Sequence, residues 1–503
     1  MLVKILNITS RSISLELDNN NPYYNNEYDI FVNDNFYKKD NRNVTSIFNL
    51  NPDTNYNIRI NNELISFKTN NESLLINVLD FNALADGITD DTVKIQAAIM
   101  SSPKNSTIYF PKGIYLISSL YLKSDINIYL EKDAILLGKT NRLDYPIHPG
   151  LIDNYSFGVW EGIEQNNFAS LINIFDSKNI NIIGEGIIDG NALNSDWYIN
   201  HRIKNIAWRG HLFYSKNSSN INIIGINFKD SPSWTIHPYM SNDINIINTT
   251  IKNKDSMPTT DGIDPDMSKN INILGNYISV GDDCIAIKSG SYDLAKKYKI
   301  SSDNITIRNN LFEKGHGGIV FGSELSGGIT NIFVTKCLFK NTDRGLRIKT
   351  RRGRGHIGII DNIVFDDNIM DYVKTPFVIN MYYNMGNQGG HEEYVWSTKY
   401  QEFNDLTPVI GSFKFNNIIC NNIEYAASVF LGLPESNIGS IEFNNVIFNY
   451  NINATSGYPV MIEKNFKLKR CGIYTLNVKH ITLNNVEFNG NIGDNIIEIE
   501  GDK

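Results

Sequence analysis

Ten segments between residues 179 and 490 repeat one pattern, and this repeat restricts the possible folds more than any other feature. Each segment is a short β-branched strand, a turn residue such as Asn or Gly, and a second short strand, as in NINIIGEGIID and NINIIGINFKD. The first strands recur at positions 180, 221, 244, 271, 305, 332, 363, 413, 441 and 481. Because no helical periodicity separates the strands, the repeat is not a βαβ unit. It predicts parallel strands stacked coil on coil, a right-handed parallel β-helix.

The spacing of the repeat supports this all-β architecture. The shortest steps are 23 to 28 residues, and the longer steps contain insertions. Asn at the same turn of successive coils can form ladders of side-chain amides, which explains the abundance of Asn without reference to function. The segment DDTVKIQAAIM at 90–100 has apolar residues at helical spacing after Asp90 or Asp91 as N-cap, and is predicted to be a helix that covers the open end of the solenoid.

The first 72 residues follow a different pattern. Short alternating segments such as SISLEL, YDIFVN and YNIRI are separated by turn residues. The stretch NPDTNYNIRINNELISFKTN resembles the closing strands of a fibronectin type III module, with Tyr56 in the place of its buried corner tyrosine. We therefore expect a small fibronectin type III-like β-sandwich over 1–72, a polar linker at 70–73, and the catalytic β-helix over 73–503. The alternative is that residues 1–70 form only the first layers of the solenoid.

Composition restricts the class of partner and the compartment. The chain of 503 residues is 41% hydrophobic and 20% charged, with a net charge of −8, which disfavours nucleic acid and anionic membranes as partners. Its start alternates like a strand and lacks the pattern of a signal peptide. The four cysteines (Cys284, Cys337, Cys420 and Cys471) lie far apart without CxxC spacing, which favours buried free thiols. A cytoplasmic location is expected, or a secreted or periplasmic one if a signal has been removed.

Charged residues gather on consecutive coils of the predicted solenoid. Asp261, the pair Asp282 and Asp283, and His316 are separated by about one coil each, and Arg347 with Lys349 follows on the next coil. Residues one coil apart lie side by side, and two residues spaced by two on a strand point the same way. The two adjacent aspartates could share a face only if the backbone turned or bulged, which Gly281 would allow.

Such crowding has a chemical consequence. Three neighbouring carboxylates cannot all ionise easily, so at least one is expected to hold a proton near neutral pH. A protonated acid beside ionised carboxylates is what the hydrolysis of glycosides requires. The two cations would suit a sugar that carries a carboxylate, so the pattern points to a polymer of uronic acid.

At this point the sequence resembles the polygalacturonase family of glycoside hydrolases, the pectin-degrading β-helix enzymes. The family's signatures occur in order as TTD (259–261), DD (282–283), GHG (315–317) and RIK (347–349). Supporting stretches include DFNALADGITDDTVKIQAAI, STIYFPKGIYLI and SPSWTIHP, and the resemblance covers about residues 76–490. Thr259 departs from the pattern, since the family usually has Asn there. His356 also departs, because it stands where a second Gly is expected.

The resemblance implies an inverting mechanism without a metal or cofactor. Asp282 would be the general acid, Asp261 and Asp283 would hold and deprotonate the attacking water, and His316 would tune the acid or position the substrate. The resemblance also implies a set of residues that bind the uronate substrate: Arg347, Lys349, and Tyr383 with Tyr382 as its rival.

Two insertions, at about 141–215 and 384–407, bear on whether the polymer is cut at its ends or in its interior. Long loops on one face of a solenoid usually border the site. Together with the leading domain they resemble the exo-acting bacterial branch, which releases galacturonate from chain ends. Outer-subsite candidates are predicted on these loops and nearby, although core packing would explain each of them equally well: Trp160, Arg209, Trp234, His237, Glu324 and His391.

Other functions remain open from the sequence. An endo-polygalacturonase, or a hydrolase of rhamnogalacturonan or xylogalacturonan, would share the fold and most of the motifs. A calcium-dependent pectate lyase or a non-catalytic sugar-binding β-helix is a more distant alternative. The sequence predicts a pectic polysaccharide or oligogalacturonide as partner and leaves the oligomeric state undetermined.

Overall fold

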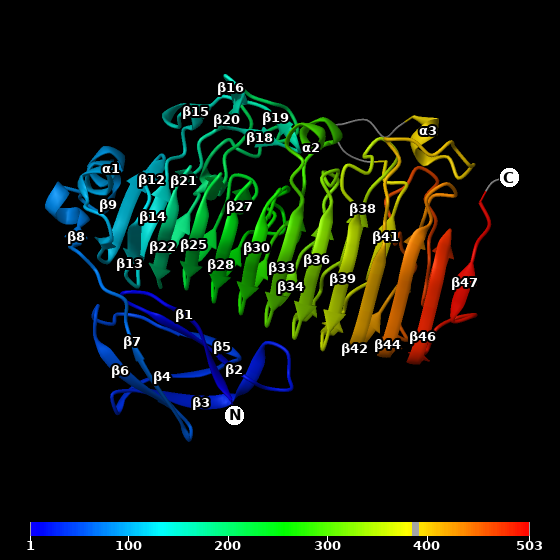
Figure 1. The fold of residues 1–503 in the computed structure, drawn as a ribbon, viewed down its shortest axis with the longest axis horizontal. Helices are drawn as coiled ribbons and strands as arrows, with labels where there is room; N and C mark the ends of the chain where they lie inside the picture. The colour runs from blue at the N-terminus through cyan, green and yellow to red at the C-terminus, as the bar shows by residue number, and fades with distance from the viewer. Residues whose placement is uncertain (1, 385–391, 502–503) are drawn as a thin grey trace.

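The computed structural model describes residues 2–384 and 392–501, and it places a small β-domain beside a long β-solenoid (Figure 1). Two antiparallel sheets, with orders β1-β2-β5 and β4-β3-β6-β7, form the first domain and fit the predicted sandwich. The hydroxyl of Tyr56 accepts a hydrogen bond from the backbone N–H of Asn51 at 2.8 Å, although this tyrosine is only half-buried. The likeness to fibronectin type III stays a prediction. The strands of this domain are β1 (Val3–Ile8), β2 (Ile13–Leu17), β3 (Tyr24–Val32), β4 (Asn35–Arg42), β5 (Val44–Ile47), β6 (Asn55–Ile60) and β7 (Glu63–Lys68).

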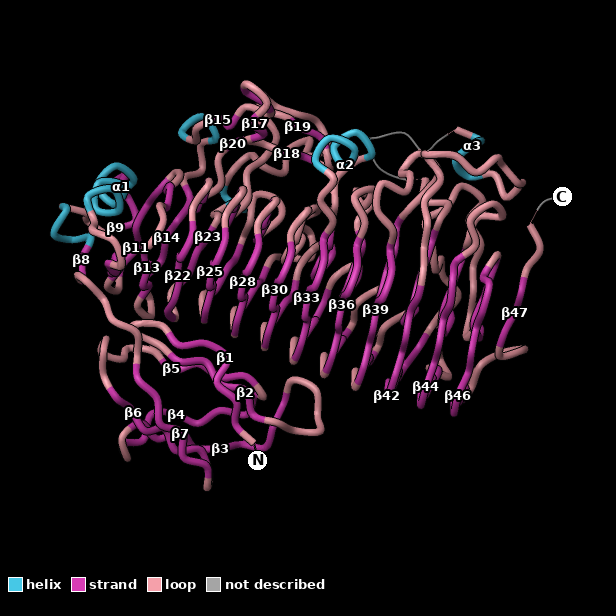
Figure 2. Tube along the Cα trace, viewed as in Figure 1, coloured by secondary structure: helices cyan, strands magenta, loops and turns pink. Residues whose placement is uncertain are grey.

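The solenoid is a parallel β-helix, as predicted. Two rows of strands join into one large sheet, and Figure 2 shows the strands lying side by side along the solenoid. The first row comprises β8 (Leu75–Asn77), β10 (Ser106–Phe110), β13 (Ile126–Leu130), β22 (Lys178–Gly184), β25 (Ser219–Ile224), β28 (Asn242–Ile247), β30 (Lys269–Leu274), β33 (Ser302–Arg308), β36 (Ile329–Thr335) and β39 (Ile360–Asp366). The second row comprises β9 (Asp86–Asp90), β11 (Gly113–Ile117), β14 (Ala134–Gly138), β23 (Ile187–Asp189), β26 (Asn227–Lys229), β29 (Thr250–Lys252), β31 (Tyr277–Ser279), β34 (Leu311–Lys314), β37 (Leu338–Lys340) and β40 (Ile369–Asp371). Both rows continue into β42 (Ser412–Ile423), β44 (Ile438–Tyr450) and β46 (Val478–Asn489).

A further face of the solenoid carries the charged motifs. It consists of two sheets, with orders β12-β21-β24-β27 and β32-β35-β38-β41-β43-β45-β47, which are linked by bridges such as Ile236 to Ile263 and Ile263 to Ile285. Its strands are β12 (Leu120–Leu122), β21 (Ile172–Phe175), β24 (Phe213–Lys216), β27 (Ile236–Tyr239), β32 (Asp283–Ile287), β35 (Gly317–Phe321), β38 (Arg344–Lys349), β41 (Thr375–Asn380), β43 (Ala426–Leu431), β45 (Cys471–Leu476) and β47 (Ile496–Glu498).

The register of the repeat confirms the sequence prediction at all ten positions. Ile180 pairs with Ile221, and the same column continues through successive coils to Ile481. The predicted amide ladder is also present, since Asn222 Nδ2 donates to Asn181 Oδ1 at 2.7 Å and Asn245 Nδ2 donates to Asn222 Oδ1 at 2.8 Å. All four cysteines are free and buried, as expected.

Helix α1 (Thr92–Ser101) lies at the start of the solenoid, as predicted. Asp91 occupies the N-cap position, but its carboxylate accepts hydrogen bonds from the backbone of Leu84 and Ala85 instead of capping the helix. The second insertion contains α3 (Glu393–Trp396), whereas α2 (Tyr292–Tyr298) lies between β32 and β33. The first insertion contains the short strands β15 (Ile147–His148), β16 (Leu151–Ile152), β17 (Tyr155–Ser156), β18 (Val159–Trp160), β19 (Ile163–Glu164) and β20 (Asn167–Phe168). They lie on the side of the solenoid opposite the first domain (Figure 1).

The first domain packs directly on the solenoid. Val44 and Phe48 join an apolar cluster with solenoid side chains that include Ile224 and Leu274. Beside this cluster, the Glu16 carboxylate accepts two hydrogen bonds from Arg308, at 2.6 and 2.7 Å. A bidentate ion pair of this kind fixes orientation as well as adding energy.

We expect Gly275→Ala to lower the free energy of unfolding by about 2 kcal/mol or more, because two costs combine. Gly275 has φ +68°, a conformation that costs an L-residue about 1–2 kcal/mol, and a Cβ there would lie 2.3 Å from Cβ of Val44. Urea unfolding measures the change. Gly493→Ala is the control, since Gly493 has φ +80° and no atom within 4 Å of an added Cβ. If Gly275→Ala and Gly493→Ala lost the same free energy of unfolding, the contact of Gly275 with Val44 would not be tightly packed.

Candidate active site

The predicted charged residues lie on consecutive strands of the face formed by β32, β35 and β38. Asp283 opens β32, His316 directly precedes β35, and Arg347 and Lys349 lie within β38. Parallel pairing places these strands side by side, with Asp283 opposite Gly317 and Val320 opposite Arg347. Residues about one coil apart in the sequence thus lie side by side on adjacent strands. This confirms that the charged residues share one strip of the solenoid face.

Asp282 is bound by His316 and by the backbone. Its Oδ1 lies 3.4 Å from His316 Nδ1, and its Oδ2 accepts a hydrogen bond from the N–H of Thr259 at 3.1 Å. Burial alone would raise the pKa of Asp282, but His316, followed by Lys349 and the Thr259 amide, lowers it well below its usual range. The same interaction raises the pKa of His316. The pair therefore carries a proton that is held mainly on the imidazole.

Asp283 interacts with the two cations. Lys349 Nζ donates to Asp283 Oδ2 at 2.8 Å, and Arg347 Nη1 lies 3.8 Å from Asp283 Oδ1. Burial opposes the charged form of Lys349, but Asp283 raises the pKa of this lysine. Arg347 also contacts Sδ of Met461 through Nη2. Both cationic side chains remain 14% exposed, so a ligand can still reach them.

Asp261 lies on the preceding coil, between β27 and β32, beside a buried lysine. Lys288 Nζ lies 3.6 Å from Asp261 Oδ2 and 3.2 Å from Asp264 Oδ1. Burial, and then the charges of Asp264 and Asp282, raise the pKa of Asp261 well above its usual range. Burial likewise raises the pKa of Asp264 to about 7. The prediction that one of the crowded carboxylates holds its proton is met by the direction of the pKa shift at Asp261, whereas Asp282 shifts the other way.

Lys288 connects this group to Glu324. Its Nζ lies 3.8 Å from Glu324 Oε2 and 4.3 Å from the ring centroid of Trp234. The side chains of Lys288, Asp264 and Glu324 are 5%, 0% and 8% exposed, so the ion cluster is sealed from water. Asp264 and Lys288 are not among the predicted site residues, although they follow the TTD and DD motifs by only a few residues, in TTDGIDPD (259–266) and GDDCIAIKSG (281–290).

These carboxylates, imidazole and cations on one face can donate a proton, accept a proton and bind an anion at once. The model of glycosyl hydrolases family 28 matches residues 103–428. The chain belongs to this family. The family comprises inverting polygalacturonases, so the predicted membership and enzyme class are confirmed.

Individual relatives agree with the family. A "Probable polygalacturonase" of Vitis vinifera is 30% identical over 357 residues, which are 70% of this chain and 69% of that protein. An "Exo-poly-alpha-D-galacturonosidase" of Dickeya chrysanthemi is 26% identical over 62% of this chain and 58% of its own length. The family 28 exopolygalacturonase of Yersinia enterocolitica has a similar fold, with a TM-score of 0.71 and 20% identity over 99% of this chain and 98% of that chain.

Gly281 allows close packing at the family's Asp-Asp motif. The backbone bends at residues 281 and 282, as expected, although Gly281 does not have a positive φ. A Cβ there would lie 2.3 Å from the carbonyl oxygen of Met257, so the requirement is space between coils.

Thr259, where the family usually has Asn, has a left-handed backbone with φ 60°. A β-branched residue is unusual in this region. The hydroxyl of Thr259 accepts a hydrogen bond from Arg209 Nη2 at 2.7 Å, while its N–H donates to Asp282. Arg209 is 4% exposed and also donates to the carbonyl of Pro232, so its place is beneath the site and not in an outer subsite as predicted.

The predicted aromatic sugar contacts are wrong, because they form a buried stack. The rings of Trp208, Trp160, Trp234 and His211 follow one another at 4.9, 5.3 and 5.4 Å between centroids and within 2° of parallel. Trp160 and Trp234 are 3% and 4% exposed, and His237 is fully buried against His211 and Trp234. The stack instead attaches the first insertion to the solenoid next to Lys288.

Tyr382 and Tyr383, the two candidates for the substrate-contacting tyrosine, differ in burial. Tyr382 is 3% exposed and its hydroxyl donates to the carbonyl of Gly432 at 2.8 Å, so it is not a substrate ligand. Tyr383 is only partly buried, so it stays the candidate for a substrate contact. Glu324 is 6% exposed and lies behind the site, in contact with Lys288, and His391 falls outside the described residues.

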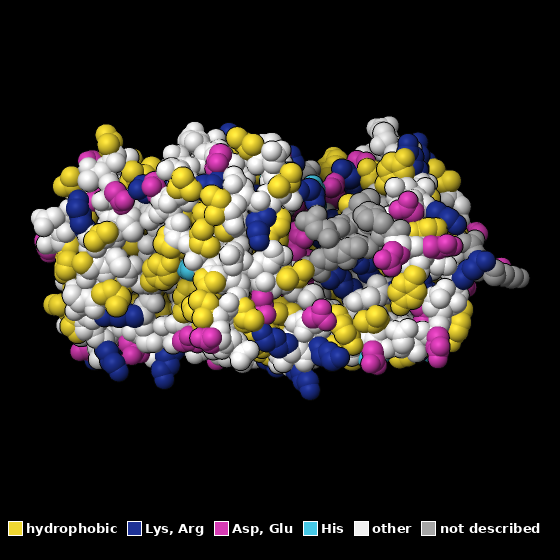
Figure 3. All heavy atoms as spheres, turned by 90° about the horizontal axis from the view of Figure 1, so that it is seen from above, with side chains coloured by type: hydrophobic (Ala, Val, Ile, Leu, Met, Phe, Trp, Pro, Cys, Tyr) yellow, Lys and Arg dark blue, Asp and Glu magenta, His cyan; other side chains and the backbone are white. Residues whose placement is uncertain are grey.

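Figure 3 views the face with the insertions, on which acidic and basic side chains are interspersed with apolar ones. Within residues 2–384 and 392–501, no three His, Cys, Asp or Glu side chains are grouped so that they could hold a metal ion. In the same ranges, no helix is long and apolar enough to span a membrane.

Proposed function

We propose that this chain is an exo-polygalacturonase that hydrolyses α-1,4-linked galacturonic acid from the ends of polygalacturonate or oligogalacturonides, with inversion. The observation that carries the proposal is the shared face on which Asp282, Asp283 and Asp261 stand beside Arg347 and Lys349. Paired carboxyl groups provide the acid and base of glycoside hydrolysis, and cations beside them select a sugar that carries a carboxylate.

Asp282 would protonate the leaving oxygen. Its pair with His316 contains one proton, and moving that proton from the imidazole to the carboxylate creates the acid without a change in net charge. A substrate that covers Asp282 would favour this transfer, since loss of water penalises the ion pair. His316 would thus act as the proton store for the acid.

Asp283 and Asp261 would position the attacking water and accept its proton. Asp283 is oriented by the hydrogen bond from Lys349, and Asp261 by Lys288 below it. Arg347 and Lys349 would bind the uronate at the scissile bond while Lys349 keeps its contact with Asp283.

The exo mode rests on the first insertion. Its strands β15 to β20 lie over the solenoid near α2, and the Trp160–Trp234 stack fixes the insertion beside Lys288 (Figure 1). A bordered site suits a chain end better than the middle of a polymer.

The pH profile tests the role of His316. Below the raised pKa of His316 the pair holds its proton, and above it the proton is lost, so kcat/KM should fall as pH rises through that pKa. In His316→Gln the proton must sit on Asp282 alone, which titrates at lower pH, and the basic limb should move to lower pH. His356→Gln is the control, because its ring binds the Thr407 carbonyl away from the site. If the basic limb of the kcat/KM profile did not move in His316→Gln, His316 would not hold the proton for Asp282.

The function itself is tested by product analysis. The chain is incubated with polygalacturonate and short oligogalacturonides, with and without a chelator, and product sizes, reducing ends and unsaturated uronate absorbance are followed together. Mono- or digalacturonate from the first time point supports the exo mode, and a spread of intermediate sizes indicates an endo enzyme. Chelator-sensitive unsaturated products would identify a lyase. No products at all would redirect the proposal to rhamnogalacturonan.

A further inference from the structure

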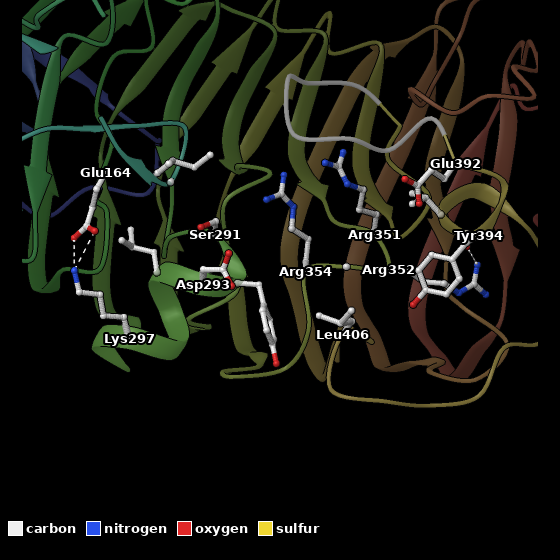
Figure 4. A pocket seen from close by; sticks show the side chains of 16 residues that line it. Glu164, Ser291, Asp293, Lys297, Arg351, Arg352, Arg354, Glu392, Tyr394 and Leu406 are labelled. Atoms are coloured by element: carbon white, nitrogen blue, oxygen red, sulfur yellow. Dashed lines mark hydrogen bonds and ion pairs between the residues drawn. The ribbon is translucent and has the colours of Figure 1, made fainter. Parts of the chain in front are cut away.

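A cavity of about 750 Å³ lies between α2 and the second insertion (Figure 4). Lys297 on its wall is paired with Glu164, as Figure 4 shows. Gly162 also lines the wall, and a Cβ there would lie 2.9 Å from Cγ of Glu324. Glu324 therefore lies directly behind the cavity wall, with its carboxylate 3.8 Å from Lys288 Nζ. The buried groups around Lys288 are the ones to which no role has been assigned.

One ammonium group serves three carboxylates in this buried cluster. Lys288 Nζ lies 3.2 Å from Asp264 Oδ1 and 3.6 Å from Asp261 Oδ2, in addition to Glu324. Burial opposes the charge of Glu324, but Lys288 and then Arg354 lower its pKa, so Glu324 has a second cation nearby. Asp261 and Asp264 have to share the charge of Lys288 with each other.

Asp261 and Asp264 differ in their access to a substrate. Both belong to the segment between β27 and β32, which adds one rung to the solenoid face through bridges at Ile263 and Asp266. Asp264 is fully buried, whereas Asp261 is 5% exposed. After burial, the charge of Asp264 is the largest influence that raises the pKa of Asp261. Asp264 thus acts on Asp261 from a position that no substrate reaches.

Asp283, the other carboxylate assigned to the attacking water, has a different environment. Lys349 Nζ donates to its Oδ2 at 2.8 Å, and Arg347 Nη1 lies 3.8 Å from its Oδ1. Two cations are therefore available to Asp283, whereas Asp261 shares one cation with Asp264. A like charge nearby favours protonation of a carboxylate, and a nearby cation opposes it. Of the two, Asp261 is the better proton acceptor.

We propose that Asp261 is the base that takes the proton of the attacking water, and that Asp264 is a positioning residue that strengthens this base from beneath. This assignment rests on the proposed function, in which Asp261 and Asp283 share the task. An O–H bond of the water breaks, its proton moves to Asp261, and the oxygen forms a bond to the anomeric carbon. The bond from that carbon to the leaving oxygen breaks as Asp282 gives its proton to the oxygen. Asp283 keeps its contact with Lys349 and holds the water.

The charged groups around Asp261 come from three neighbouring elements. On β27, His237 pairs with Asp266, and its Nε2 lies 3.5 Å from Asp266 Oδ2. The start of β32, the residue that follows it and the loop after β35 provide the others, which are Asp282, Asp283, Lys288 and Glu324. Neutralising Asp264 would remove a like charge from Asp261 and leave Lys288 more fully to it.

The test compares the pH profiles of kcat/KM on trigalacturonate for the wild type, Asp264→Asn and Asp266→Asn. The acid limb of kcat/KM marks protonation of the base in the free enzyme. In Asp264→Asn the acid limb should move to lower pH by about one unit or more, because Asp261 stays ionised in more acidic solution. Asp266→Asn is the matched control. Asp266 is equally buried and burial raises its pKa to about 7, but it pairs with His237, so the acid limb should not move.

Infrared titration gives a readout that needs no substrate, because protonated carboxyl groups absorb apart from carboxylates. In the wild type, the carboxyl band that persists to the highest pH within the cluster should belong to Asp261, and it should be absent in Asp261→Asn. In Asp264→Asn this band should disappear at lower pH. Asp264→Ser, a second neutral variant, should show the same shift, and thermal unfolding shows which variants are folded.

The outcomes separate the base from the proposed function. If the acid limb of Asp264→Asn stayed at its wild-type position, Asp261 would not be the base and Asp283 would take its place. If Asp264→Asn and Asp266→Asn shifted the limb equally, Asp264 would have no specific role. If the wild-type chain cleaved no galacturonide, the proposed function would fail and the base with it, while the infrared titration would still decide whether Asp264 raises the pKa of Asp261.

Discussion

Asp282→Asn is expected to lower kcat on oligogalacturonides by about 10²- to 10⁴-fold while leaving the fold intact, because general acid catalysis contributes a factor of this order. The amide keeps the shape of the side chain and can still accept the N–H of Thr259. It has no acidic proton for the leaving oxygen. KM should change little, since Arg347 and Lys349 remain in place. Initial rates measured at several substrate concentrations give both constants.

The matched control is Asp255→Asn. Asp255 also forms an ion pair, with Lys314, but its side chain is 56% exposed and lies outside the site. Its kcat should stay within about twofold of the wild type, because exposed ion pairs contribute little. If Asp282→Asn kept a tenth or more of kcat, Asp282 would not be the acid. The raised pKa of Asp261 would then make Asp261 the next candidate.

The coil register could be predicted from the sequence because it depends on local alternation. Each first strand presents an inward apolar residue, and a slip by one residue would turn the whole column toward solvent. Ile180, Ile221 and Ile244 therefore align as their spacing indicates. Insertions change the length of a step but not the phase of the strand that follows.

The central charges could be predicted for the same reason, since a solenoid fixes which coil each motif occupies. The positions of the outer-subsite candidates could not be predicted in this way. Aromatic side chains that stack on each other and those that stack on sugars look alike in sequence, so Trp160 and Trp234 were assigned to subsites although they stack in the interior. Burial depends on the path of a long insertion, which no local pattern specifies.

The buried cation was missed because its partners come from three separate segments. Lys288 follows the apolar run IAI and would alternate to the outer face of β32, where a lysine is usually solvated. Only the tertiary structure brings Asp264 and Glu324 to it and places the ring of Trp234 over its ammonium group.

We therefore expect Lys288→Met to have the largest effect on stability of any single change in the site. Removing one partner of a buried ionic group typically costs about 3–5 kcal/mol, because the remaining charges lose their compensation. Met fills a similar volume, so the loss would report charge and not a cavity. Urea unfolding at about pH 8 measures it.

The loss should depend on pH with a definite sign. In the folded chain the pKa of Asp264 is already raised to about 7, above its unfolded value, and removal of Lys288 would raise it further. A carboxyl group with a raised folded pKa destabilises the fold progressively as pH rises from its unfolded pKa to its folded pKa, and the effect vanishes at acid pH where both states are protonated. The deficit of Lys288→Met relative to the wild type should thus be large at about pH 8 and much smaller at about pH 4.

Lys297→Met is the matched control for this variant. Its side chain is 37% exposed and pairs with Glu164 near the surface, so its deficit should stay below about 1 kcal/mol at either pH. A deficit of Lys288→Met that was equally large in acid would mean that packing against Trp234, and not charge, explains the position of Lys288. A deficit that disappears in acid would identify Lys288 as the counter-charge that allows Asp261 and Asp264 to ionise beneath the candidate active site.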